Sequence, residues 1–110
     1  MRVYVAGPYT LGNVESNIHA AITAGERLLK AGHTPYVPHL NHLWGLLYPG
    51  SREQWMRLDL NWLLQCEAVL RLPGISQGAD VEVATAHSLG LPVFWNITDL
   101  APEAHDDYDL

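Results

Sequence analysis

The sequence has few of the features that cross-link, export or anchor a protein. Cys66 is its one cysteine, which excludes an internal disulfide framework and is typical of a reducing, cytoplasmic setting. Its apolar stretches are too short to span a bilayer, and no basic region followed by a long apolar segment opens the chain. With 110 residues, we expect one soluble domain that has its own hydrophobic core and no membrane partner.

Basic residues are also scarce, and the acidic residues are unevenly placed. Six lysines and arginines oppose twelve aspartates and glutamates, which gives a net charge of −6. Residues 1–98 hold all six basic residues and seven of the acidic ones, which predicts a nearly neutral domain followed by an acidic tail over residues 99–110. No basic stripe is available for the phosphate backbone of DNA or RNA, which argues against a nucleic acid polymer as partner. A small nucleotide bound by backbone amides stays compatible with this charge.

Short β-branched and aromatic segments alternate along the chain with segments of helical periodicity. We predict strands over residues 2–6, 33–38, 68–72 and 91–95. We predict helices over residues 13–31, with Asn13 or Ser16 as the N-cap, over residues 79–89, and from Ser51 onward. Residues 40–50 are irregular and rich in turn formers, which predicts a long loop with one helical turn. The alternation predicts an α/β fold of Rossmann or flavodoxin type, a parallel sheet covered by helices on both faces.

In a sheet of this kind, ligands bind beyond the carboxyl ends of the strands. This rule points to the loops that follow Ala6, Val37, Leu72 and Trp95. We therefore expect the functional residues to lie in these loops and beside them.

An aspartate stands on the apolar face of the helix that opens at Ser51. Asp59 shares this face with residues at spacings of three and four, namely Trp55, Trp62, Leu63 and Cys66. An unpaired charge on a buried face is costly, so Asp59 is either used in chemistry or balanced. The balancing alternatives are an ion pair with Arg57 or Arg71, or a place at the solvent-exposed rim.

Glu82 is likewise an acidic residue on an apolar helix face. It lies in the helix over residues 79–89, where the other residues of that face are alanine, valine and leucine. It lies near the start of the helix, where the helix dipole favours an ionised carboxylate. The preceding Ser76-Gln77-Gly78 puts a hydroxyl group and a bare backbone at the helix N-terminus, which suits an anion or a polyol. The alternative is that Glu82 stabilises the helix end and does no chemistry.

Two acidic side chains that face one cleft suit the chemistry of a glycosidic bond. One carboxylate attacks the anomeric carbon, and the other handles the proton of the leaving group, which in a nucleoside is the base. A nucleophilic carboxylate has to be ionised and fixed by a hydrogen bond, which we expect Tyr9 in the first loop to donate. The alternative for Tyr9 is an aromatic ring at the rim, with its hydroxyl group in water.

Three segments carry a resemblance to a known family. Residues 5–10 (Val-Ala-Gly-Pro-Tyr-Thr) resemble the opening loop of the nucleoside 2-deoxyribosyltransferase superfamily. Residues 59–66 resemble the aspartate-bearing helix of the related deoxynucleoside-monophosphate N-glycosidases, and residues 72–82 resemble their nucleophile segment. The resemblance extends over nearly the whole chain up to Asp99. It is strongest to small uncharacterised members of the superfamily, which share the Gly-Pro-Tyr and Gly-Ala-Asp-x-Glu motifs.

The resemblance implies a Rossmann-like fold and the roles of several side chains. Glu82 matches the glutamate nucleophile, and Asp59 matches the aspartate that positions or protonates the base or the sugar. Ser76 and Gly78 match positions that contact the 5′ end of the sugar or its phosphate. His39 matches a histidine after the second strand, for which a contact with the base and a solvated loop position are the two alternatives.

The opening loop is expected to bind substrate through Gly7 and Pro8, but it departs from the pattern of the monophosphate hydrolases. These relatives have serine and arginine where this chain has Pro8 and Thr10. A phosphate clamp is therefore weakened, which favours a nucleoside or a phosphate held only by Ser76, Gly78 and the helix end. Family members complete each active site with a residue from a neighbouring subunit's C-terminal region, so the resemblance implies a homo-oligomer, at least a dimer. Here Asn96 or the acidic tail is the candidate for that residue.

We predict an enzyme that cleaves or exchanges the N-glycosidic bond of a 2′-deoxynucleoside or its 5′-monophosphate without a cofactor. The alternatives are a non-catalytic module that binds a nucleotide or nucleotide sugar, and a structural subunit whose acidic tail recruits a basic partner. No metal site is expected, because His39 and His42 lie three residues apart but no cysteine joins them. Gly7 and Gly12 lack the Lys-Ser/Thr pair of a phosphate-binding loop, which argues against an NTPase.

Overall fold

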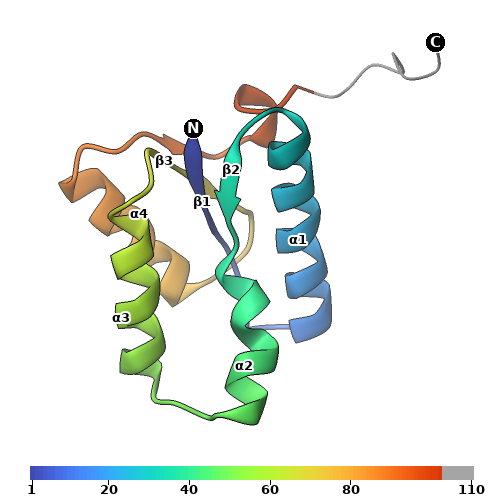
Figure 1. Ribbon diagram of the computed structural model, residues 1–110, viewed down its shortest axis with the longest axis vertical. Coiled ribbons are helices and arrows are strands. Elements are labelled where there is room, and N and C mark those ends of the chain that lie inside the picture. Colours follow the sequence, from blue (N-terminus) through green and yellow to red (C-terminus); the bar gives the residue numbers. More distant parts are fainter. Residues whose placement is uncertain (103–110) are drawn as a thin grey trace.

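A four-stranded parallel sheet forms the centre of the computed structural model, which describes residues 1–102 (Figure 1). The strands are β1 (Arg2–Ala6), β2 (Thr34–Tyr36), β3 (Ala68–Arg71) and β4 (Val93–Phe94), in the spatial order β2-β1-β3-β4. Every pairing between neighbouring strands is parallel. The predicted α/β class and parallel sheet are therefore confirmed.

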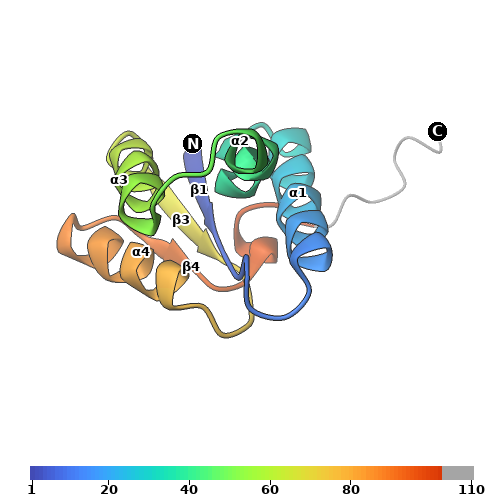
Figure 2. The ribbon, with the colours of Figure 1, turned by 90° about the horizontal axis from the view of Figure 1, so that it is seen from below.

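Helices cover both faces of the sheet, as predicted (Figure 2). On one face lie α1 (Val14–Lys30) and the short 3₁₀ helix η2 (Ile97–Asp99), and on the other lie α3 (Arg52–Leu63) and α4 (Gln77–Ser88). A 3₁₀ turn η1 (Pro38–Asn41) and α2 (His42–Leu47) follow β2. Within residues 1–102, every helix is too short or too polar to be a membrane-spanning segment.

Side-chain caps fix where three of these helices begin. The side-chain oxygens of Asn13, Ser51 and Ser76 accept hydrogen bonds from backbone N–H groups in the first turns, at 2.8, 3.1 and 3.1 Å. Of the two candidate caps for α1, the structure selects Asn13. Gly32 follows α1 with φ +92°, a conformation that glycine adopts without the steric cost of a Cβ atom.

The structure corrects several predicted boundaries. The sequence predicts a long loop with one helical turn over residues 40–50, but η1 and α2 reach to Leu47. Pro38 stands in the first turn of η1, where its fixed φ fits. Pro38 thereby also ends β2 early. The helix that follows β3 begins at Gln77 rather than at residue 79, because Ser76 caps it.

The packed domain also extends past the boundary predicted at residue 98. Leu100 and Ala101 are buried in the core, and Arg27 Nε donates a hydrogen bond to the Ala101 carbonyl at 3.0 Å. His33 Nε2 lies 2.8 Å from the Leu100 carbonyl. The rest of the predicted acidic tail, residues 103–110, lies outside the described residues.

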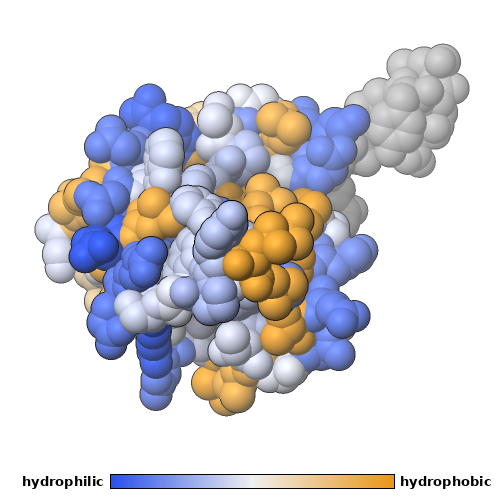
Figure 3. Space-filling view, turned by 60° about the horizontal axis from the view of Figure 1, so that its bottom comes forward, coloured by the Kyte–Doolittle hydropathy of each residue, from blue (hydrophilic) through white to orange (hydrophobic). Residues whose placement is uncertain are grey.

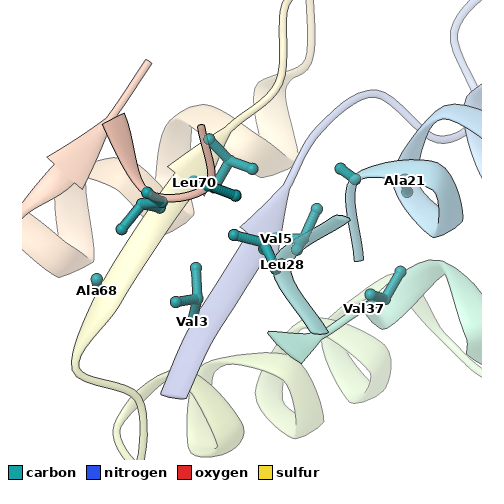
Figure 4. Close-up of a cluster of buried hydrophobic side chains, with 10 residues drawn as sticks. Val3, Val5, Ala21, Leu28, Val37, Ala68 and Leu70 are labelled. Carbon is teal, nitrogen blue, oxygen red and sulfur yellow. The ribbon is translucent and has the colours of Figure 1, made fainter. Parts of the chain in front are cut away.

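The alternation of strand side chains divides the interior into two clusters. Val3 and Val5 of β1 pack with Leu28 of α1 on one face (Figure 4). Tyr4 and Ala6 point to the opposite face, where α3 and α4 cover them. The second face is the one that carries the functional side chains described below.

Neighbouring leucines of α1 test the first cluster. Leu28 is fully buried, whereas 57 % of Leu29 is exposed. We expect Leu28→Ala to lower the free energy of unfolding by about 2–5 kcal/mol, because it removes buried contacts and leaves a cavity. Leu29→Ala, the matched control, is expected to change it by less than about 0.5 kcal/mol. Urea titrations followed by circular dichroism measure both, and equal effects would contradict the packing described here.

Candidate functional site

A cavity of about 720 Å³ lies at the carboxyl ends of the strands, a size suited to a small organic ligand. Its walls come from the β1–α1 loop, η1, α2, α3 and the first half of α4. The predicted site residues on these walls are Gly7, Tyr9, His39, Asp59, Ser76, Gly78 and Glu82. Pro8 is not among the lining residues, and neither is any residue of the loop that follows Trp95. The sequence-based candidates therefore converge on one cavity from loops far apart in the chain.

Glu82 is the deepest acidic group of this cavity. Only 7 % of the residue is exposed, and its Oε2 accepts a hydrogen bond from the hydroxyl group of the buried Tyr4. This contact ties the centre of the sheet to α4.

The expectation that Tyr9 holds the Glu82 carboxylate is wrong. The Tyr9 hydroxyl group is hydrogen-bonded to His42 Nδ1, and its ring packs edge-on against His39 and His42. Tyr9 follows β1 in a loop that faces η1 and α2, whereas Tyr4 lies within the strand and points directly toward α4. Tyr9 nevertheless lines the cavity.

Asp59 is half-buried on α3 and receives a long hydrogen bond from a second tyrosine. The Tyr36 hydroxyl group lies 3.5 Å from Asp59 Oδ1, and Asn41 Nδ2 donates to the Tyr36 oxygen at 3.4 Å. The ion pairs among residues 1–102 do not include Asp59, so the alternatives with Arg57 and Arg71 do not occur there. The carboxyl group is therefore balanced by neutral donors alone.

The two tyrosines form one aromatic stack beneath the carboxyl groups. The Tyr4 and Tyr36 ring centroids lie 5.5 Å apart at 31°, and Trp62 stacks on the other side of Tyr36 at 5.5 Å and 21°. Such packing restricts the rotamers of both phenol rings. The hydroxyl groups that meet Glu82 and Asp59 are thus held in place by the rings that carry them.

Burial changes the protonation of both carboxyl groups. It raises the pKa of Glu82 to about 7, with the charge of Asp59 adding to the rise and the Tyr4 hydrogen bond and Arg71 opposing it. Burial raises the pKa of Asp59 to about 6, against the hydrogen bond from Tyr36. Burial and the nearby Glu82 also raise the pKa of Tyr4, which keeps its hydroxyl group protonated as a donor. Both carboxyl groups can therefore change protonation state near neutral pH, as an acid–base pair requires.

His39 is a buried side chain of the wall, not a solvated loop residue. Its Nε2 lies 2.9 Å from the Pro8 carbonyl, and burial lowers the pKa of its imidazole ring. The neutral ring therefore joins η1 to the β1–α1 loop. Pro8 contributes to the site through this carbonyl and not through its side chain.

The start of α4 forms the wall beside Glu82. Ser76 accepts the N–H of Ala79 at 3.1 Å through its hydroxyl oxygen, as the N-cap of the helix. A Cβ atom on Gly78 would meet Met56 Cε of α3 at 3.5 Å, an ordinary contact, so this glycine leaves the backbone open toward the cavity without a packing need. The predicted polar wall at Ser76 and Gly78 thus faces the same space as Asp59 and Glu82.

Sequence reasoning missed Tyr4, Tyr36, Trp55 and Arg52. Tyr4 and Tyr36 hold the carboxyl groups, and the other two line the cavity. The alternation of side chains in β1 was the available signal for Tyr4, because it separates Tyr4 from Val3 and Val5. Identifying its partner required knowing which helices cover that face.

No group of three or more histidine, cysteine, aspartate or glutamate side chains within residues 1–102 is arranged to hold a metal ion. His39 and His42 instead meet the Pro8 carbonyl and the Tyr9 hydroxyl group.

Comparisons with known proteins agree with this architecture. The model of a family described as a domain of unknown function, DUF4406, matches residues 1–95. Among solved structures, a 2-deoxyribosyltransferase from the psychrotolerant bacterium Bacillus psychrosaccharolyticus superposes with a TM-score of 0.69 at 22 % identity, covering 99 % of this chain and 88 % of that one. This likeness confirms the predicted Rossmann-like α/β fold. No curated protein sequence matches the chain.

Glu82 should make stability depend on pH. Its pKa is raised in the folded protein, so its favourable contribution is complete below its ordinary pKa and is lost as the pH rises through about 7. We therefore expect Glu82→Gln to be more stable than the unmodified protein by roughly 1–3 kcal/mol at pH 8, with the difference vanishing near pH 4. Glu26→Gln on the exposed face of α1 is the control. Thermal unfolding across this range measures the effect, and a destabilised Glu82→Gln at pH 8 would contradict the burial argument.

Proposed function

The chain belongs to the DUF4406 family, and we propose that it is an enzyme that cleaves or exchanges the N-glycosidic bond of a 2′-deoxynucleoside or its 5′-monophosphate. The observation that carries the proposal is the pair of carboxyl groups, Glu82 and Asp59, that face one cavity with raised pKa values. A buried glutamate on a helix is costly to keep if it serves packing alone. The fold shared with a 2-deoxyribosyltransferase supports the same chemistry.

In the first step, the ionised Glu82 attacks the anomeric carbon of the sugar. A bond forms from a carboxylate oxygen to that carbon, the N-glycosidic bond breaks, and the base leaves with the bonding electron pair. The Tyr4 hydroxyl group fixes the carboxylate for this attack. Because the pKa of Glu82 is about 7, its ionised form is accessible near neutral pH.

Asp59 assists the departure of the base. Its pKa, about 6, lies below that of Glu82, so the reactive form, with the proton on Asp59 and Glu82 ionised, is the minor form of the singly protonated pair; in it Asp59 passes its proton to the leaving nitrogen or oxygen of the base. A water molecule or the nitrogen of a second base then attacks the anomeric carbon and passes its proton to the ionised Asp59, while the bond from the carbon to Glu82 breaks and Glu82 leaves as the carboxylate. Hydrolysis results in the first case and base exchange in the second.

The residues on the cavity wall favour a nucleoside over its monophosphate. Arg52 is the one arginine or lysine among the lining residues in the described part of the chain. Pro8 and Thr10 stand where the resembling monophosphate hydrolases have serine and arginine. A phosphate group would therefore rely on Ser76, Gly78 and the N-terminus of α4.

A screen by mass spectrometry tests the proposal. Ribo- and deoxyribonucleosides and their 5′-monophosphates are incubated with the protein, with and without a second free base. We expect release or exchange of the base, and a loss of turnover of at least about 1,000-fold in Glu82→Gln, because the nucleophile is removed. Glu26→Gln, on the exposed face of α1, serves as the control and should retain turnover.

Equal turnover in Glu82→Gln and in the unmodified protein would exclude Glu82 as the nucleophile. If no substrate turns over but a nucleotide raises the melting temperature, the protein is instead a binding module for nucleotides or nucleotide sugars. Free base alone would identify a hydrolase, and a new nucleoside would identify a transferase.

We also propose that the protein works as a homo-oligomer, at least a dimer. Large apolar and aromatic side chains on and beside α2 stay exposed in the single chain: Leu40, Leu43, Trp44, Leu46, Leu47 and Tyr48. Figure 3 shows hydrophobic surface gathered near the centre of this face. Contiguous apolar surface of this kind is typical of protein interfaces. Because α2 also lines the cavity, a second copy seated on it would lie beside the substrate.

Charge on this patch should break the assembly. We expect the unmodified protein to sediment as a dimer or larger oligomer and Leu43→Glu/Leu47→Glu to sediment as a monomer, since a buried unpaired carboxylate opposes association. Leu29→Glu, at an exposed leucine of α1, is the matched control and should keep the assembly. A monomeric unmodified protein at concentrations of tens of micromolar would contradict this proposal.

A further inference from the structure

A buried arginine stands at the end of the central strand β3, next to the proposed catalytic group. Arg71 is the last residue of β3 and pairs in register with Ala6 of β1. Its side chain is only 6 % exposed, although it follows three buried apolar residues in a strand of the core. Burying a guanidinium group is costly unless its N–H donors have hydrogen-bond partners. The contacts of Arg71 therefore indicate its role.

The hydrogen bonds of its side chain all lie in the loop between β3 and α4 and in the first turn of α4. Nη1 donates to the Leu72 carbonyl, and Nη2 donates to the Gly74 carbonyl at 2.9 Å. Nη2 also meets Asp80 Oδ1 at 3.1 Å, and the Trp95 ring lies 6.0 Å from Arg71 Cζ. The two terminal nitrogens of the guanidinium group thus join three points of one short segment, while its buried Nε has no hydrogen-bond partner within residues 1–102.

The loop that Arg71 holds is constrained from its other side as well. Gly74 has φ +111°, and a Cβ atom there would lie 2.8 Å from Cγ of Pro8 in the β1–α1 loop. The loop leads directly to Ser76 and Gly78 on the cavity wall and, one turn later, to Glu82. A shift of the Gly74 carbonyl would therefore displace the wall and the carboxylate together.

We propose that Arg71 is a positioning residue of the site: its guanidinium group fastens the β3–α4 loop and the first turn of α4 to the sheet and so sets the place of the Glu82 carboxylate. The part of this inference that concerns catalysis rests on the proposed function. The part that concerns the loop and the ionisation of Glu82 does not.

The charge of Arg71 predicts the direction in which the pKa of Glu82 shifts when Arg71 is replaced. The groups around Glu82 are Tyr4 on β1, Asp59 on α3, Arg71 on β3 and Asp80 on its own helix, while β4 presents only valine and phenylalanine. Arg71 lowers the pKa of Glu82, whereas burial and Asp59 raise it. Removing the guanidinium charge should therefore move the ionisation of Glu82 to higher pH.

Nuclear magnetic resonance tests the inference without any substrate. The ¹³C signal of the Glu82 carboxyl group, assigned by its loss in Glu82→Gln, is titrated in the unmodified protein, Arg71→Lys and Arg71→Met. We expect the midpoint to rise by at least about 0.5 pH units in Arg71→Met and to stay near its original value in Arg71→Lys, which keeps the charge. An unchanged midpoint in a folded Arg71→Met overturns the inference.

Amide hydrogen exchange reports on the loop in the same samples. The Ala79 N–H, which donates to Ser76 Oγ, should exchange at least about tenfold faster in Arg71→Lys, because lysine cannot reproduce the fork. The Leu91 N–H, which donates to the Ala86 carbonyl at 2.9 Å beyond the other end of α4, is the internal control. Arg2→Lys, an exposed arginine bonded to the Gln65 carbonyl, is the matched control variant. Equal exchange of Ala79 in all variants overturns the inference.

Asp80→Asn covers the case in which Arg71→Met does not fold. The Asp80 side chain is 69 % exposed, so this variant weakens one contact of Arg71 and leaves the core untouched. Faster exchange of the Ala79 N–H is expected again, and its absence counts against the inference. If the unmodified protein turns over no nucleoside while these effects are present, the proposed function fails and the role of Arg71 in positioning Glu82 stands.

Discussion

The hydrogen bond from Tyr4 to Glu82 joins the central strand to α4 at a depth where an ionised carboxylate is costly. Burial raises the pKa of Glu82, and the hydrogen bond from Tyr4 and the charge of Arg71 oppose this rise. Asp59 on α3 is likewise a carboxyl group held partly away from water, and the Tyr36 hydroxyl group is its hydrogen-bond donor. The face of the sheet that these groups share is therefore polar at one end and apolar at the other, and the ligand cavity lies at the polar end.

Strand order explains why that polar end is hollow. In the order β2-β1-β3-β4, the connections from β1 and β3 lead to helices on opposite faces, so the loops diverge where the two strands end. The gap between them is lined by the β1–α1 loop and by the start of α4. Arg71 holds the β3–α4 loop, and the absence of a side chain at Gly74 lets Pro8 of the β1–α1 loop approach it closely. Positioning is thus supplied by Arg71 and the loops, and the proposed catalytic groups stand on α3 and α4.

Raised pKa values and stability oppose each other in this site. A glutamine at position 82 would be easier to bury at alkaline pH, and yet a nucleophile has to be ionised there. The protein keeps the carboxyl group near its ionisation point, where neither state is strongly disfavoured. His39 and the tyrosines of the cavity are neutral, so that the charge of the site is set by Glu82, Asp59 and Arg52 together with the nearby Arg71.

Local signals in the sequence were sufficient for the α/β class, the parallel sheet, the start of α3 at Ser51, and the two carboxyl groups on apolar helix faces. These depend on neighbours within a turn or a strand, which the sequence shows directly. Tertiary structure alone decided that Tyr4, and not Tyr9, meets Glu82, because the partners are 78 positions apart and share a face only after α4 packs on β1. It likewise decided the burial of Leu100 and Ala101 and the place of Arg71, since each depends on segments that meet only in the folded chain.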